Sequence, residues 1–157
     1  LSFKMNKKQL DEYTPNINGV ITKNGIPIRD HEITFGINSE KLNEELIVKT
    51  DKNGEFNFDA IYVEKDKNME GIFHEKRVSI YILTNYDDKK VILWNSTLSG
   101  FVVSDFERSN LGNLNCEINN PISSFAFKDG QENSAPVYVY SQCSLFGYFQ
   151  SEVIGDS

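Results

Sequence analysis

Apolar and polar residues alternate with a period of two over much of the chain. Ile33, Phe35 and Ile37 alternate with less apolar neighbours, and the same pattern returns at residues 78–83 and 114–118. Because successive side chains of a strand point to opposite faces of a sheet, this spacing predicts half-buried strands. No convincing helical periodicity follows residue 14. The pattern therefore predicts an all-β protein built as an antiparallel β-sandwich.

Short turn sequences separate the predicted strands. Asn-Gly at residues 24–25 and Asp-Asp-Lys at residues 87–89 each join two apolar runs, which predicts β-hairpins. Residues 50–58 read T-D-K-N-G-E-F-N-F. Asp51 can accept hydrogen bonds from the amides that follow it, and Gly54 tolerates a positive φ. This stretch predicts a third hairpin, with its two phenylalanines on one face.

Shifts in composition divide the chain into three predicted parts. Residues 1–15 are a polar lead-in, for which a short helix is one option, and residues 16–120 form the β-sandwich domain. Pro121 marks a boundary, and residues 121–157 form a C-terminal β extension packed on the sandwich. Residues 62–75 are charged and irregular, which predicts a long surface loop.

The composition fits one globular domain with an acidic surface. The 157 residues are 39% hydrophobic and 12% aromatic, and the formal net charge is -7. Nucleic acid binding needs a basic face, so this charge excludes nucleic acid as a partner. No run of about 18 apolar residues occurs, so no membrane-spanning segment is predicted. The chain begins at Leu1, which leaves open the removal of an export signal.

The sequence holds no pattern that predicts an enzyme. Nucleophile-elbow and phosphate-binding glycine motifs are absent, and neither His31 nor His74 has a second histidine at zinc-binding spacing. The stretch that begins at Asp51 faintly resembles a calcium loop, but the twelfth position of that loop is Tyr62 instead of glutamate. We therefore expect no catalytic residue, no cofactor and no metal.

The two cysteines, Cys116 and Cys143, leave the cellular compartment open. Neither lies in a C-x-x-C motif. Two independent buried thiols are common in cytosolic cores, whereas one disulfide would form in an oxidising compartment. The spacing fits both interpretations, so the cytoplasm stays an alternative to the periplasm.

Acidic residues on two predicted connections are the candidate partner-binding residues. Acidic loops suit a positively charged cleft on a partner protein, although the same composition also serves solubility alone. The candidates are five carboxylates and one phenylalanine that can act as an apolar anchor: Glu64, Asp66, Glu70, Phe73, Asp87 and Asp88. Trp94 or Tyr81 would instead stack on a sugar in a carbohydrate-binding module, with core packing as the simpler interpretation of Trp94.

Several stretches resemble known families. The opening at residues 19–28 and the T-D-x-x-G-x-F-x-F stretch at residues 50–58 resemble carboxypeptidase-regulatory-like, transthyretin-like β-sandwich modules. More narrowly, Ile92-Leu93-Trp94 and the L-x-C-E-I stretch at residues 114–118 are similar to small bacterial proteins linked to type VI secretion. The segment after Pro121 departs from that shorter pattern.

The resemblance implies a fold and a function. It implies a transthyretin-like or immunoglobulin-like sandwich without catalytic residues. It also implies a periplasmic immunity protein that binds a cognate secreted toxin and occludes the toxin's active site. The alternative is a structural or accessory module of a secretion or envelope assembly. A disulfide between Cys116 and Cys143 would accord with export.

Overall fold

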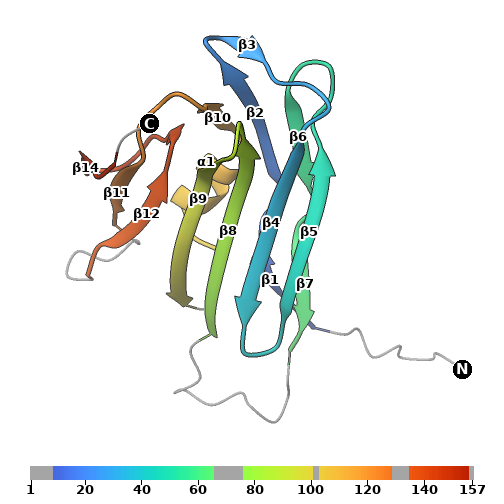
Figure 1. Ribbon diagram of the computed structural model, residues 1–157. Helices are drawn as coiled ribbons and strands as arrows, with labels where there is room; N and C mark the ends of the chain where they lie inside the picture. Colours follow the sequence, from blue (N-terminus) through green and yellow to red (C-terminus); the bar gives the residue numbers. More distant parts are fainter. Residues whose placement is uncertain (1–8, 66–75, 101–102, 129–134, 156–157) are drawn as a thin grey trace, which may run out of the picture.

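The computed structural model describes residues 9–65, 76–100, 103–128 and 135–155, which form an all-β protein with one short helix. In Figure 1, a long-stranded sheet lies in front of a second layer of strands. The sandwich-like all-β fold predicted from the alternation is confirmed. No helix among the described residues has the length and apolarity needed to cross a membrane.

The front layer is a seven-stranded antiparallel sheet, called the large sheet below. Its centre is the hairpin predicted at residues 87–89, where Asp87 and Asp88 both have positive φ, 50° and 61°, as a type I′ turn requires. In sheet order the strands are β14 (Gln150–Val153), β11 (Ser123–Phe127), β12 (Val137–Ser141), β9 (Lys89–Gly100), β8 (Lys76–Tyr86), β4 (Glu32–Ser39) and β5 (Asn43–Lys49).

The back layer is a smaller sheet that contains one parallel pair. β2 lies beside β10 in parallel and beside β3 and β6 in antiparallel orientation. The predicted Asn24-Gly25 turn joins β2 to β3, with φ of 52° and 79° at its two residues. The strands are β13 (Cys143–Ser144), β10 (Leu114–Glu117), β2 (Ile17–Lys23), β3 (Ile26–Pro27) and β6 (Glu55–Phe58).

Two further strands, β1 (Leu10–Thr14) and β7 (Ile61–Glu64), prolong the β2–β6 pair into a longer ribbon. Pro15 has no N–H and interrupts the ladder. The Oδ1 atom of Asn16 accepts the Ala60 N–H at 2.8 Å, and Thr14 Oγ1 accepts the Ile61 N–H at 3.2 Å. Side chains thus satisfy the amides where backbone pairing stops.

The ribbon corrects two predictions. Residues 10–14 of the predicted lead-in form a strand instead of a helix, because their partners are the residues just after β6. The predicted loop at residues 62–75 begins later than expected, since Tyr62 to Glu64 belong to β7. The rest of that loop after Lys65, and residues 1–8, lie outside the described residues.

The predicted hairpin at residues 50–58 is correct as a turn but wrong as a strand pair. Asp51 Oδ1 accepts the N–H groups of Asn53 and Glu55 at 2.8 and 2.9 Å, and Gly54 has a φ of 74°. The strand before the turn is β5 of the large sheet, whereas the strand after it, β6, pairs with β2. The turn therefore carries the chain from one layer to the other.

The C-terminal segment joins both layers instead of packing on a finished sandwich. β11, β12 and β14 continue the large sheet beyond β9, where Tyr140 lies opposite Asn95. β13 pairs with β10, and Cys116 and Cys143, directly opposite each other, form a disulfide with Cα atoms 4.0 Å apart. In Figure 1, the three outer strands flank β9 on the left.

A helix that the alternation did not predict, α1 (Asp105–Leu111), lies behind β8 and β9 in Figure 1. Its signal is a capping box, in which the side chain of Glu107 accepts the Ser104 N–H at 3.1 Å. With seven residues, the helix is too short for periodicity to reveal it. Leu111 on α1 is fully buried, so α1 belongs to the core.

The core fills the space between the layers. Its largest fully buried side chains come from both sheets and from α1: Trp94, Phe35, Phe127, Ile17, Ile21, Ile33, Ile37, Ile82, Leu93, Leu111, Leu114 and Val139. Phe56 and Phe58 both point inward, as predicted, and are 4% and 3% exposed. Burial of apolar surface on this scale is the main source of the fold's stability.

Candidate functional site

The three predicted partner-binding residues that the structure describes, Glu64, Asp87 and Asp88, do not lie together. Glu64 ends β7, and its backbone oxygen accepts a hydrogen bond from Lys41 Nζ in the β4–β5 turn. That turn lies near Val78 of β8, whereas Asp87 and Asp88 follow Tyr86 at the other end of β8, eight residues or roughly 26 Å of strand away. Asp66, Glu70 and Phe73 lie outside the described residues.

A pocket of about 490 Å³ lies at the β3 end of the molecule and is lined in part by Lys23, His31 and Tyr86. Lys23 pairs with Asp87 at 3.5 Å, and its ammonium group lies 5.0 Å from the Tyr86 ring centre. His31 Nε2 lies 2.8 Å from the Asn85 carbonyl oxygen. The described residues that line the pocket include no serine, cysteine or carboxylate that could form a nucleophile–base pair with His31.

Trp94 is fully buried, and its Nε1 donates a hydrogen bond to Ser96 Oγ at 2.8 Å. Its ring is therefore not available to stack on a sugar. Tyr81 lies on the outer side of the large sheet, over Gly36, where a Cβ would meet the ring. The Tyr81 hydroxyl donates to Glu45 Oε2 at 2.6 Å, and this hydrogen bond raises the pKa of Tyr81.

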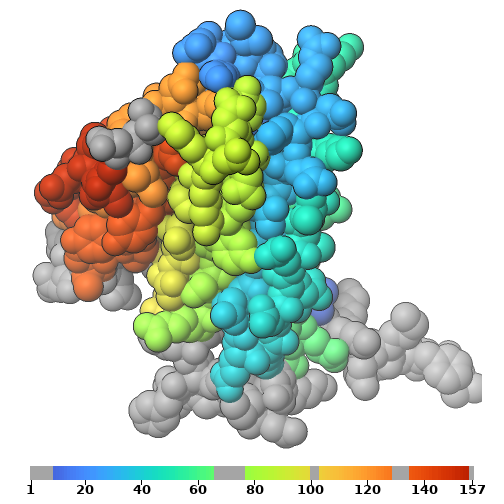
Figure 2. Space-filling view, viewed as in Figure 1, coloured from blue at the N-terminus to red at the C-terminus, as the bar shows by residue number. Residues whose placement is uncertain are grey.

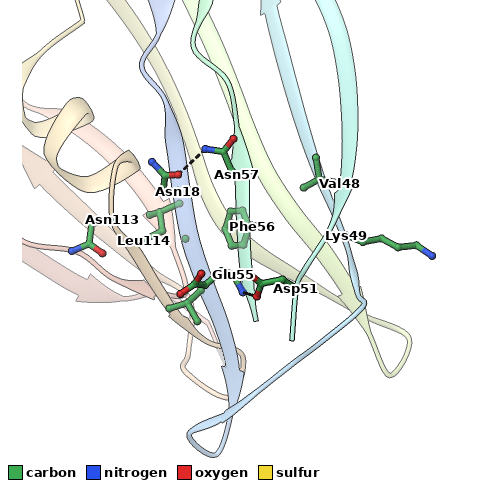
Figure 3. Close-up of a pocket in the computed structure, with 11 residues that line it drawn as sticks. Asn18, Val48, Lys49, Asp51, Glu55, Phe56, Asn57, Asn113 and Leu114 are labelled. Atoms are coloured by element: carbon green, nitrogen blue, oxygen red, sulfur yellow. Dashed lines mark hydrogen bonds between the residues drawn. The ribbon is translucent and has the colours of Figure 1, made fainter. Parts of the chain in front are cut away.

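A second groove, of about 500 Å³, opens between β5 and the β2–β6 pair. Figure 3 shows Val48 and Lys49 on one side and Phe56 and Asn57 on the other. Asn57 Nδ2 donates to Asn18 Oδ1 at 2.6 Å, drawn as a dashed line in Figure 3. Amides and carboxylates line this groove without a histidine or cysteine, so it offers no nucleophile–base pair.

Exposed tyrosines gather on the outer side of the large sheet. Tyr138 and Tyr140 alternate on β12 with the buried Val139 and are 51% and 40% exposed. Tyr140 lies opposite Asn95, which in turn lies opposite Tyr81 on β8. We call Tyr138, Tyr140 and Asn95 the outer tyrosine face. Figure 2 looks onto this side, with the orange-red strand β12 beside the yellow and yellow-green strands β9 and β8.

The tyrosines of β12 were missed as a site, although the signal is in the sequence. Val-Tyr-Val-Tyr at residues 137–140 alternates, and a buried valine series leaves the tyrosines on the other face. What alternation alone cannot tell is which face is outside. That depends on the pairing of β12 with β9, which the structure provides.

Helix α1 positions more aromatic residues of the C-terminal segment. The side chain of Asn110, 1% exposed, accepts the Phe146 N–H and donates to the Phe146 carbonyl, both at 3.0 Å. Phe106 stacks on Phe127 with ring centres 4.4 Å apart, and Tyr148 meets Phe125 edge to face. These contacts hold a connection in which Phe146 remains 46% exposed.

Glu117 fastens the turn between β2 and β3 to the end of β10. Its carboxylate accepts the Gly25 N–H at 2.9 Å, the Asn119 N–H at 3.0 Å and the Thr22 hydroxyl at 3.3 Å. Burial by itself would raise the pKa of Glu117, but these hydrogen bonds to the charged form outweigh it and lower the pKa. The Glu117 carboxylate therefore has a structural role, which is to hold the β2–β3 turn against the end of β10.

No cluster of three or more histidine, cysteine, aspartate or glutamate residues in the described part of the chain could hold a metal ion. The buried polar side chains of that part all have hydrogen-bond partners. What the described surface offers is aromatic area on a rigid sheet, which suits binding better than chemistry.

Comparison with known proteins gives a family. Neither the curated proteins nor the solved structures contain a match. A family described as "Domain of unknown function (DUF6795)" matches residues 17–121, which is more than half of the chain. The match runs from β2 to just beyond β10 and stops before β11. The chain therefore belongs to the DUF6795 domain family.

Proposed function

We propose that this protein is a bacterial immunity-type protein that binds a secreted toxin of a type VI system and neutralises it. Binding occludes the toxin's active site sterically, and no residue of this chain takes part in chemistry. The resemblance noted in the sequence suggests this class of partner. The described surface is compatible with it, since the exposed Tyr138 and Tyr140 lie on β12, a strand that pairs with neighbours on both sides.

The main observation that supports the proposal is the outer tyrosine face. Tyrosine is enriched at protein interfaces because a rigid ring buries much area at little entropic cost, while the hydroxyl finds a polar partner. Tyr138 and Tyr140 supply two such rings, and Asn95 beside them supplies an amide. Such rings at the centre of an interface commonly contribute most of the binding energy.

Charge supports a basic partner. The chain carries a net charge of -7, and its C-terminal segment, residues 121–157, contains one lysine against four carboxylates. An acidic surface around aromatic anchors accelerates association with a positively charged cleft and makes the rate depend on salt. The tyrosines thus provide contact area, and the carboxylates provide steering.

The Cys116–Cys143 disulfide supports export to the periplasm, because disulfides persist in oxidising compartments. Thiol titration of unreduced protein from the native host checks this part of the proposal. We expect no reactive thiol after unfolding in the absence of reductant. Two titratable thiols would contradict periplasmic residence.

The binding proposal is tested with the toxin encoded beside this gene. We expect a complex by pulldown and calorimetry, protection of cells that express the toxin, and inhibition of the toxin in vitro. The double variant Tyr138→Ala/Tyr140→Ala should weaken binding by at least about a hundredfold, as loss of two anchor side chains commonly costs 3 kcal/mol or more.

The matched control is Tyr62→Ala on β7, which removes a tyrosine of similar exposure, 55%, outside the outer tyrosine face. This variant should bind as the unmodified protein does. Absence of any complex, or equal loss of binding in both variants, would contradict the proposal. Binding to an envelope component without protection from the toxin would replace it with an accessory role.

A further inference from the structure

Strand β5 forms one edge of the large sheet, and no described strand pairs with its outer side. It contains three consecutive apolar residues, of which Leu46 is 41% and Ile47 56% exposed. The unpaired edge of a strand is a template for another strand, because its N–H and C=O groups are ready to bond. The outer edge of β5 is therefore available to pair with another strand.

The hydrogen bonds to β4 decide which backbone groups are free. The Thr50 N–H donates to the His31 carbonyl at 2.9 Å, and the Ser39 N–H donates to the Leu42 carbonyl at 2.7 Å. These pairs are of the hydrogen-bonded type, and this type alternates along an unbroken antiparallel register. Even-numbered residues of β5 therefore bond to β4, and the odd-numbered ones direct their N–H and C=O groups outward.

We infer that β5 pairs with β5 of a second copy of this chain, antiparallel and centred on Ile47. In this register Ile47 lies opposite Ile47 of the second copy, and Glu45 lies opposite Lys49 on each side of the two-fold axis. Glu45, Ile47 and Lys49 all have outward backbone groups, so each opposed pair can exchange two hydrogen bonds. Opposite charges across strands add stability.

Charge selects this register over its neighbours. Sliding the second copy by two residues keeps odd-numbered residues opposite each other, as the free backbone groups require. In one direction Glu45 then faces Ile47, and in the other it faces Asp51, a like charge. Of these three registers, only the one centred on Ile47 places a lysine, Lys49, opposite the Glu45 carboxylate of each copy. In the single chain Lys49 pairs with Asp30 at 4.0 Å. Because both side chains are exposed, this ion pair holds Lys49 only weakly.

The side chains on the inner face of β5 also favour pairing with a second copy. Leu46 and Val48 point toward the core side, opposite Phe35 and Ile33 of β4, and Val48 lines the groove in front of Phe56. In the inferred dimer, Leu46 of each copy lies opposite Val48 of the other. Their contact covers apolar area that the single chain leaves at the open edge of the sandwich.

Strand β5 also lacks most devices that block edge pairing. It has no proline and no bulge, and its two glutamates and one lysine flank the apolar centre without interrupting it. Its charges favour pairing in the inferred register, oppose it in the register that places Glu45 opposite Asp51, and leave Glu45 without a cation in the other. The second copy therefore fits this edge better than an arbitrary strand does.

Sedimentation velocity of the full chain tests the inference without any toxin. We expect a monomer–dimer equilibrium over roughly 10 μM to 1 mM, the range of small interfaces. Ile47→Pro removes the central N–H, which points to solvent in the single chain, so the variant should fold and remain monomeric. Circular dichroism checks that its fold is retained.

Charge reversal tests the register independently of proline. Glu45→Lys and Lys49→Glu each place like charges opposite one another twice, by symmetry, and should weaken the dimer at least about tenfold. The double variant Glu45→Lys/Lys49→Glu restores both opposed pairs and should recover the dimer. A monomer at 1 mM, a dimer that survives Ile47→Pro, or a double variant as weak as the single variants would overturn the inference.

Discussion

At the scale of single residues, close contacts explain why certain positions accept few side chains. Gly19 on β2 lies against the ring of Phe56, and a Cβ at residue 19 would stand 2.4 Å from the Phe56 Cζ atom. Because the ring is only 4% exposed, it cannot swing into solvent. The glycine is thus required by packing between β2 and β6.

We predict that Gly19→Ala lowers the free energy of unfolding by about 1–3 kcal/mol, the usual cost of overpacking. Chemical denaturation measures it. Phe56→Leu should relieve the clash, so the double variant Gly19→Ala/Phe56→Leu should lose less stability than the sum of the two single variants. Strict additivity would show that the contact does not limit residue 19.

The carboxylate of Glu117 makes stability depend on pH. Its pKa in the folded protein lies below the ordinary value of 4.5. The charged carboxylate therefore stabilises the folded state more than the neutral carboxyl group does. The contribution is complete above that ordinary value and is lost as the pH falls through the lowered folded value. The Thr22, Gly25 and Asn119 donors cause this preference.

We therefore expect Glu117→Gln to lower the free energy of unfolding at pH 7 by on the order of 1 kcal/mol. The difference from the unmodified protein should shrink as the pH falls below 4.5. Denaturation curves between pH 3 and pH 7 measure it. Glu152→Gln, on the exposed edge strand β14, is the charge-matched control and should change stability little. A difference independent of pH would contradict the role of the charge.

At the scale of elements, the disulfide ties the short strand β13 to β10. β13 has only two residues, too few for a ladder to hold alone, and Cys143 and Cys116 lie directly opposite each other. The covalent bond closes a loop across a separation of 27 residues that includes β11 and β12. It therefore restricts the unfolded state of residues 116–143.

We predict that Cys116→Ala/Cys143→Ala lowers the free energy of unfolding by roughly 3–4 kcal/mol, following the loop-closure estimate. Thermal and chemical unfolding under non-reducing conditions measure the loss. Reduction of the unmodified protein should cause a similar loss, and reductant should leave the double variant unchanged. Equal stability with and without the bond would contradict the prediction.

One side chain of helix α1, Asn110, forms hydrogen bonds with the backbone of the C-terminal segment. Asn110 bonds both backbone groups of Phe146, so removing its amide leaves an N–H and a C=O without these partners. Asn110→Ala should cost about 1–3 kcal/mol, the penalty of unsatisfied partly buried polar groups. Hydrogen exchange at the Phe146 amide should accelerate. Asn113→Ala, at an exposed position just beyond the helix, is the control and should change neither measurement.

At the scale of the whole molecule, both sheets depend on residues 121–157, about the last quarter of the chain. β12 pairs with β9, and β13 with β10, so the predicted division into residues 16–120 and 121–157 does not follow the sheets. The family match, at residues 17–121, also ends between strands that share sheets with later ones. The C-terminal segment therefore completes both sheets.

We predict that residues 1–120 alone do not unfold cooperatively. Without β12 the edge of β9 is exposed, and without Cys143 the end of β10 loses its covalent partner. Circular dichroism during heating, with the full chain as reference, should give a broad transition or aggregation. A sharp transition close to that of the full chain would show that the C-terminal segment is dispensable.

Alternation and turn chemistry sufficed for the strands and turns that depend on neighbours in sequence. The turns at Asn24-Gly25 and Asp87-Asp88 follow from residues that accept positive φ, and the inward direction of Phe56 and Phe58 follows from a period of two. The capping box before α1 was readable from Ser104 and Glu107, but a helix this short leaves little periodic signal.

Pairing between distant strands was decided only in the tertiary structure. The turn at Asp51 is the same whether the next strand pairs with β5 or with β2, and only the packing of two layers selects β2. The position of Tyr140 beside Asn95, the separation of Glu64 from Asp87 and the free edge of β5 are likewise properties of the assembled sheets. Local φ preferences and alternation arise from consecutive residues, whereas pairing depends on burial and hydrogen bonds between residues far apart in sequence.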